Sequence, residues 1–140
     1  IAESGAAIVA QALDWARPKL EREPVLIYAS APPEQVAAVQ AKLGREHAGA
    51  LIEDAMAKIA QGLVAAGVRR LVVAGGETSG AVVQGLGVKA LRIGPQIDPG
   101  VPATLAIGEP RLARPPLALA LKSGNFGGED FFMKALSQLR

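Results

Sequence analysis

The sequence contains no cysteine, a single histidine and few aromatic residues, which make up 4% of its 140 residues. Without cysteine, disulfide bonds and thiolate metal sites are excluded, and a reducing, cytoplasmic location is the expectation. The single histidine, His47, has no second imidazole or thiolate that could complete a zinc site. We therefore predict no transition-metal chemistry and no metal-ligating residues.

Long apolar stretches and a large charge of one sign are also missing. No run reaches the roughly 18 apolar residues of a membrane span, so no membrane partner is predicted. Fifteen basic and thirteen acidic residues leave a formal charge of +2, and the basic residues are scattered. Nucleic-acid binding is therefore not expected. Residues 1–4 lack an initiator methionine and the basic start of a signal peptide, so we interpret the chain as cut from a longer protein.

Apolar residues, which make up half of the chain, repeat with helical spacing in several segments. Residues 5–21 predict a helix that Pro18 bends or ends early. Residues 46–66 give the clearest pattern, with Gly67 placed to end the helix. A shorter helix is expected around residues 36–43, and two more follow the glycine-rich turns described below. Aromatic residues on apolar helix faces, expected in the core, are Trp15, Phe131 and Phe132.

Short apolar runs rich in β-forming residues predict five strands. They cover residues 25–29, 68–74, 90–93, 103–107 and 117–121. Helices separate the early strands, whereas the later connections are too short for helical crossovers, so part of the sheet is expected to be antiparallel. The predicted fold class is α/β: a single domain over residues 1–140, with a layered mixed, largely parallel sheet covered by helices.

Two glycine-rich turns each follow a predicted strand and lead into a helix. The first turn comprises Gly75, Gly76, Glu77, Thr78, Ser79 and Gly80. The second begins with Lys122, Ser123, Gly124 and Asn125 and continues through Phe126 to Gly128. Because ligands of open α/β sheets bind beyond the carboxyl ends of the strands, the two turns are expected to share one ligand site.

The residue types in these turns favour a phosphate ligand. Glycine lets the backbone approach an anion closely, and the free N–H groups at a helix start can bind it. The hydroxyls of Thr78 and Ser79 and the ammonium of Lys122 add donors. The Glu77 carboxylate would repel phosphate, so it either holds magnesium, bonds a ribose or adenine group, or only stabilises the helix start. Asn125 either bonds a phosphate or occupies a left-handed turn position.

Neither turn matches the P-loop or the G-x-G-x-x-G pattern. From the residue types alone, a ligand site and a pair of purely structural turns are about equally supported. The presence of two such turns in one small domain favours the ligand modestly.

Three ordered motifs resemble the C-terminal nucleotide-binding domain of the four-carbon acid sugar kinases. They are residues 74–80, residues 88–97 with 99–102, and residues 119–128 continuing to 130–132. Tyr28, Ala29 and Ser30 also look like the strand end at which this family contacts the nucleotide through a serine. The family often has a second serine or a similar small residue where Ala29 stands. The similarity covers most of the chain from Pro24 onward.

The resemblance implies an ATP site shared by Ser30, the turn at residues 75–80, and Gly124 with its neighbours. It also implies an enzyme of carbohydrate metabolism that uses ATP and magnesium to phosphorylate a hydroxyl of a four-carbon acid sugar. Family members carry the acid-sugar pocket in a separate N-terminal domain, which has no counterpart in this sequence. We therefore expect this domain alone to be inactive, its partners to be ATP or ADP and an acid sugar bound through the other domain, and the catalytic base to lie elsewhere.

Two alternatives stay open at this point. One is a non-catalytic module that binds another phosphorylated metabolite, and the other is a protein-interaction module. The sequence is also compatible with a homo-oligomer.

Overall fold

The computed structural model describes residues 2–28, 41, 44–112, 116–123 and 129–139. Helix α1 (Ala2–Ala16) passes into a 3₁₀ helix, η1 (Arg17–Lys19), which contains Pro18, so the α-helix ends early as predicted. Helix α3 (Arg45–Ala65) confirms the clearest helical pattern, and Gly67 follows it with a φ of 108°. The helix predicted around residues 36–43 lies outside the described residues except at Ala41, which is helical.

The sheet has four strands in the spatial order β1, β4, β3, β2. Their bounds are β1 (Arg70–Ala74), β2 (Val88–Asp98), β3 (Val101–Gly108) and β4 (Ala118–Lys122). Strands β1 and β4 are parallel, whereas β4–β3 and β3–β2 are antiparallel. The sheet is mixed as predicted, but the expectation that it is largely parallel was wrong. The physical reason is that β2, β3 and β4 follow one another through short connections, which favour antiparallel neighbours.

The strand predicted at residues 25–29 was also wrong over the part that the structure describes. Residues 24–28 form no strand. Val25 and Ile27 instead pack against a cluster that contains Leu13 of α1 and Leu63 of α3. Only alternate residues of the apolar run are covered in this way, because Leu26 and Tyr28 are 55% and 70% exposed.

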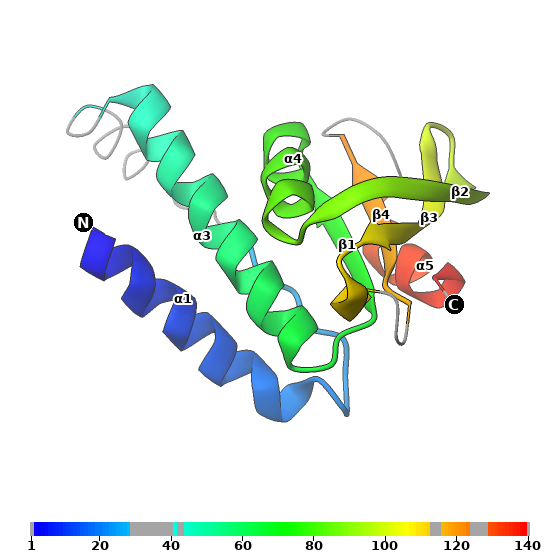
Figure 1. The fold of residues 1–140 in the computed structure, drawn as a ribbon, viewed down its shortest axis with the longest axis horizontal. Helices are drawn as coiled ribbons and strands as arrows, with labels where there is room; N and C mark the ends of the chain where they lie inside the picture. The colour runs from blue at the N-terminus through cyan, green and yellow to red at the C-terminus, as the bar shows by residue number, and fades with distance from the viewer. Residues whose placement is uncertain (1, 29–40, 42–43, 113–115, 124–128, 140) are drawn as a thin grey trace.

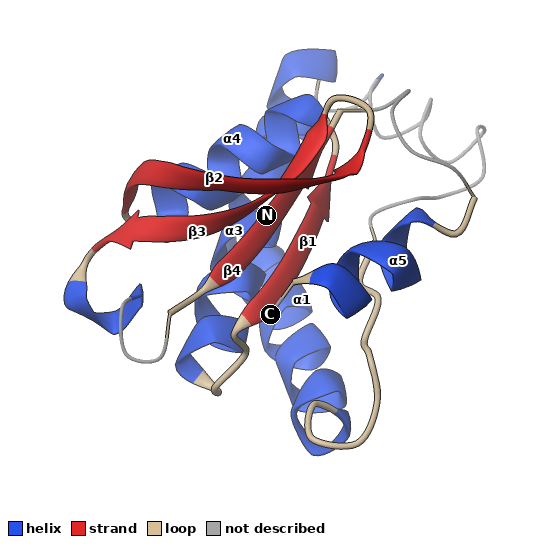
Figure 2. Cartoon of the chain, turned by 90° about the vertical axis from the view of Figure 1, so that its right-hand side faces the viewer, coloured by secondary structure: helices blue, strands red, loops and turns tan. Residues whose placement is uncertain are grey.

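Helices cover both faces of the sheet (Figures 1 and 2). Helices α3 and α4 (Gly76–Gly85) cover one face, and α5 (Phe131–Gln138) covers the other. The core on the α3–α4 side includes Val64, Val73, Val82, Leu86, Leu117 and Leu119. The core beneath α5 includes Val101, Ala118, Ala120, Phe131, Ala135 and Leu139. Helix α1 lies on the outer side of α3 (Figure 1), and a short 3₁₀ helix, η2 (Pro110–Leu112), follows β3.

The aromatic residues expected in the core differ in how far they are buried. Phe131 is 1% exposed, as predicted, but Phe132 is 37% and Trp15 is 49% exposed. Helical spacing identifies an apolar stripe, yet it does not show what covers that stripe. Among the described helices, none is both long enough and apolar enough to cross a lipid bilayer.

Candidate nucleotide site

The two glycine-rich turns begin side by side because β1 and β4 are parallel neighbours. The register of these strands pairs Ala74 with Lys122. The backbone N–H of Gly75 donates to the carbonyl oxygen of Lys122 at 2.7 Å. Gly75 has a φ of 103°, a conformation that glycine adopts without strain. Both turns therefore leave the sheet at one place, the carboxyl ends of two adjacent strands (Figure 2).

Helix α4 begins at once after Gly75, so residues 76–80 are helical and do not form a loop. Gly75 is the N-cap and has no side chain that could accept a hydrogen bond from the first helical N–H groups. A Cβ placed on Gly76 or on Gly80 would meet no atom within 4 Å, and both residues are exposed. The first turn of α4 therefore presents backbone N–H groups and the positive end of the helix dipole to an outside acceptor.

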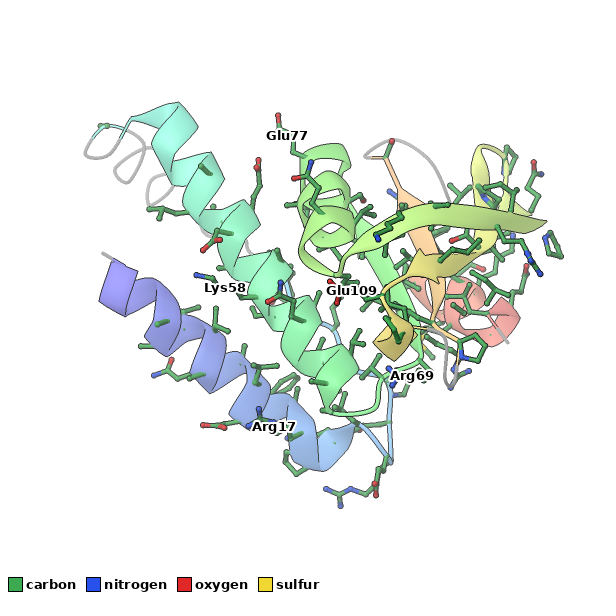
Figure 3. The ribbon with its side chains drawn as sticks, in the orientation of Figure 1. Arg17, Lys58, Arg69, Glu77 and Glu109 are labelled. Atoms are coloured by element: carbon green, nitrogen blue, oxygen red, sulfur yellow. The ribbon has the colours of Figure 1, made fainter. Side chains whose placement is uncertain are left out.

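The side chains of the first turn of α4 differ in exposure. Glu77 is exposed and points outward from the helix (Figure 3). Thr78 is half-buried, and its Oγ1 would lie 3.5 Å from a Cβ on Gly75, so this hydroxyl lies beside the N-cap. Ser79 is 8% exposed, and its buried Oγ has no hydrogen-bond partner among the described residues. Of the two hydroxyls, that of Thr78 is the more accessible to a ligand.

The Lys122 side chain contacts Ser123 and Phe131 at the end of β4. Its Nζ donates to the backbone oxygen of Ser123 at 3.2 Å and lies 5.9 Å from the ring centre of Phe131. Ser123 is exposed. The ammonium of Lys122 thus stays close to the start of the second turn. Ser30, Gly124 and Asn125 lie outside the described residues.

The structure adds a carboxyl group that the sequence did not indicate. Glu53 of α3 faces Glu77, and a hydrogen bond between the two carboxyl groups raises the pKa of Glu53. Partial burial and the charge of Glu77 raise this pKa further. Two facing carboxylates suit a hard cation such as Mg²⁺. In the part of the chain that the structure describes, however, no three His, Asp or Glu side chains gather into a metal cluster.

No sequence signal could have identified Glu53. It lies in the middle of a long amphipathic helix, and its contact with Glu77 depends on how α3 packs against α4. That packing is close, because Gln61 donates to the carbonyl oxygen of Gly85 at 2.6 Å. A Cβ on Gly85 would lie 3.0 Å from the Cβ of Ala57.

Similarity to known proteins identifies the family. A family model described as the nucleotide-binding C-terminal domain matches residues 1–132. The chain belongs to this family. This nucleotide-binding C-terminal domain is 62% identical over 136 residues to a protein named 3-oxo-tetronate kinase from Pseudomonas fluorescens. It is 67% identical over 117 residues to a protein of the same name from Cupriavidus necator. The resemblance seen in the three motifs is thereby confirmed.

A solved structure shares the fold. The crystal structure of a Haemophilus influenzae protein superposes with a TM-score of 0.80 at 41% identity, over 94% of this chain and 31% of that one. The match to the Pseudomonas protein covers 97% of this chain and 30% of the relative, and the match to the Cupriavidus protein covers 84% and 26%. The domain therefore spans about 30% of the length of the curated relatives that it matches.

Proposed function

We propose that this domain binds the ATP of a kinase that transfers the γ-phosphate to a hydroxyl of a four-carbon acid sugar. The observation that carries the proposal is the hydrogen bond between Gly75 and Lys122, because it brings two glycine-rich turns to one end of the sheet. The name shared by the relatives, 3-oxo-tetronate kinase, supports the substrate class. The phosphates would lie against backbone N–H groups of α4, where helix geometry provides donors and partial positive charge.

Among the described residues, backbone N–H groups, a hydroxyl and an ammonium group would bind the phosphates. The N–H groups around Gly76 and Glu77 and the hydroxyl of Thr78 would donate to phosphate oxygens. Lys122 would add a full positive charge close by. The further contacts that we propose are Ser30, Gly75, Ser79, Gly80, Ser123, Gly124 and Asn125.

Magnesium would be held mainly by the phosphates, with Glu77 and its neighbour Glu53 as the carboxylates at hand. Mg²⁺ commonly keeps several waters and uses one or two carboxylates plus substrate phosphates, so a large protein cluster is unnecessary. The ion would supply neutralisation of the phosphate charge during transfer. The protein's part is to hold the polyphosphate in position, since phosphoryl transfer depends largely on positioning and charge stabilisation.

The acid sugar and the catalytic base would belong to another part of the kinase. We therefore propose that this domain alone binds nucleotide but does not transfer phosphate. We also propose a cytoplasmic location, which the lack of cysteine in this domain favours.

Calorimetric titration of the 140-residue chain with ADP and Mg²⁺ tests the proposal. We expect saturable binding, with a stabilisation of about 2.7 kcal/mol at a hundredfold excess over Kd. Gly76→Val should preserve the fold, because a Cβ there meets open space, and should weaken binding at least about tenfold by blocking backbone approach. Gly49→Val is the matched control, since Gly49 on α3 is equally unobstructed. An absence of heat and of thermal stabilisation at millimolar ADP, or equal losses in both variants, would contradict the proposal.

A further inference from the structure

The turn between β2 and β3 is joined to helix α5 by a shielded ion pair. Nζ of Lys134 lies 2.5 Å from Oδ1 of Asp98, and the Asp98 side chain is only 13% exposed. By contrast, both side chains of the Asp14–Arg17 pair on the protein surface are more than half exposed. Water screens the Asp98–Lys134 pair less than the Asp14–Arg17 pair. The Asp98–Lys134 pair therefore restrains the β2–β3 turn and α5 more strongly.

The pKa of Lys134 agrees with this contact. The hydrogen bond to Asp98 raises that pKa above its ordinary value, against the opposing effect of burial. The negative charges of Asp98 and Asp130 raise it further. Lys134 is therefore charged throughout the neutral pH range.

The ion pair lies at the end of the sheet where the candidate nucleotide site is. Asp98 pairs with Val101 across the β2–β3 turn. Thr104 of β3 pairs with Leu119 of the antiparallel strand β4, so the start of β3 lies toward the Lys122 end of β4. Figure 2 shows the β2–β3 turn at the end of the sheet where β1 and β4 also end.

A continuous series of contacts leads from Asp98 to the site. Lys134 lies one helical turn after Phe131 in α5, so both are fixed by the same turn of helix. Phe131 is 1% exposed and packs in the cluster that contains Val101 and Ala120. Nζ of Lys122 lies over the Phe131 ring, and the Lys122 backbone oxygen accepts the hydrogen bond from Gly75.

We propose that Asp98 is a positioning residue for nucleotide binding. By holding Lys134 it fixes the first turn of α5, and Phe131 then supports the ammonium of Lys122 where the phosphates bind. A lysine side chain is long and flexible, so its charge is useful at one place only if neighbouring groups restrict it. This inference rests on the proposed function, because it assigns Lys122 a phosphate ligand.

Asp98→Asn gives a test in which two explanations predict opposite signs. The variant keeps the shape of the side chain and removes a negative charge, so electrostatics alone would tighten binding of a polyphosphate. Positioning through Lys134 predicts the reverse, a roughly 3- to 10-fold weaker Kd for ADP with Mg²⁺ by calorimetry. Asp14→Asn changes the net charge equally at an exposed pair on α1 and should leave this Kd unchanged.

Two further variants separate positioning from a general loss of stability. Lys134→Arg keeps the ion pair and should bind ADP within about twofold of the wild type. In a Lys122→Met background, Asp98→Asn should cause little additional loss, because its effect is transmitted through Lys122. Circular dichroism checks that each variant folds. If Asp98→Asn does not fold, the exchanged pair Asp98→Lys with Lys134→Asp should fold and bind, since it restores the contact.

The outcomes distinguish this inference from the function on which it rests. If wild-type protein binds ADP but Asp98→Asn binds equally or more tightly, the positioning role is overturned and the proposed function stands. Independent losses for Asp98→Asn and Lys122→Met, multiplying in the double variant, also overturn it. If the wild type does not bind ADP, the proposed function fails and the inference fails with it.

Discussion

The end of the sheet around Gly75 and Lys122 and the surface formed by α1 with residues 26–28 expose very different groups. The former presents glycine backbone, a lysine ammonium and a carboxylate above a tightly buried core. The latter presents large apolar side chains, which are Ile8, Trp15, Leu26 and Tyr28, exposed by 57%, 49%, 55% and 70%. These side chains border an open hollow of about 370 Å³. The comparison teaches that the candidate phosphate site is identified by its donors, whereas no charged residue is among the described residues that border the hollow.

The largest change in the free energy of unfolding is expected for a core residue of β4. Leu119 of β4 is fully buried between the sheet and helices α3 and α4. Leu119→Ala should lower the free energy of unfolding by about 2 to 5 kcal/mol, because it removes buried methyl groups and leaves a cavity. Urea denaturation measures the change. A loss below about 1 kcal/mol would show that this core is not packed as described.

Two glycine-to-alanine changes at the start of α4 should have opposite signs. Gly75→Ala places a side chain at a φ of 103° and should destabilise the fold by about 1 to 3 kcal/mol. Gly80→Ala lies inside the helix with open space around its Cβ, and should stabilise by up to about 1 kcal/mol. Thermal and urea unfolding of both variants check the signs. Equal effects would mean that the conformation at Gly75 is not required.

A smaller effect is expected on the α1 side. Ile8→Gln should change the free energy of unfolding by less than about 1 kcal/mol, because Ile8 is already 57% exposed and glutamine suits a helix. The Kd for ADP should not change, since Ile8 lies on the outer helix. If Ile8→Gln weakens ADP binding while Gly76→Val does not, the roles that we assign to the two sides are reversed.

The smallest effect is expected on how the melting temperature changes with pH, through the Glu53–Glu77 contact. Since the contact raises the folded pKa of Glu53, the folded protein holds that proton more tightly than the unfolded chain. This contribution to stability is fully present below the unfolded pKa of about 4.3 and is lost as pH rises through the folded pKa. Glu53→Gln cannot undergo this loss, so its melting temperature relative to wild type should rise between about pH 4 and pH 7.

The neighbouring residue provides the control for that pH effect. Asp54 pairs with Lys58 at 2.9 Å on the exposed side of α3. The melting temperature of Asp54→Asn should not rise relative to that of the wild type over the same pH range. If the melting temperatures of Glu53→Gln and wild type change with pH in parallel, the carboxyl groups of Glu53 and Glu77 do not interact.

Much of the fold could be predicted because local pattern and final packing agree. The helix at residues 46–66 appears as α3 because its apolar residues are covered on two sides. Ile59 and Leu63 belong to the cluster with α1, and Ala60 and Val64 belong to the cluster with α4 and the sheet. The strands predicted at residues 90–93 and 103–107 appear within β2 and β3. The segment at residues 25–28 could not be predicted, because a short apolar run is typical of a buried strand, whereas here only Val25 and Ile27 pack against helices.

The candidate site could be predicted only in part. The contact between Gly75 and Lys122 was expected, because neighbouring parallel strands end at the same edge of a sheet and ligands bind there. The contacts of Glu53 with Glu77 and of Asp98 with Lys134 join residues far apart in the chain. They depend on how helices pack on the sheet, and residue types alone do not specify that packing.

Nuclear magnetic resonance of the ¹⁵N-labelled chain, titrated with ADP and Mg²⁺, tests the central claim most directly. Our account predicts saturable shifts of the amide signals of Gly75, Gly76, Glu77, Thr78 and Ser123, with α1 signals unchanged. Shifts confined to the α1 side around Ile8 and Trp15, or no shifts at millimolar nucleotide, would contradict it.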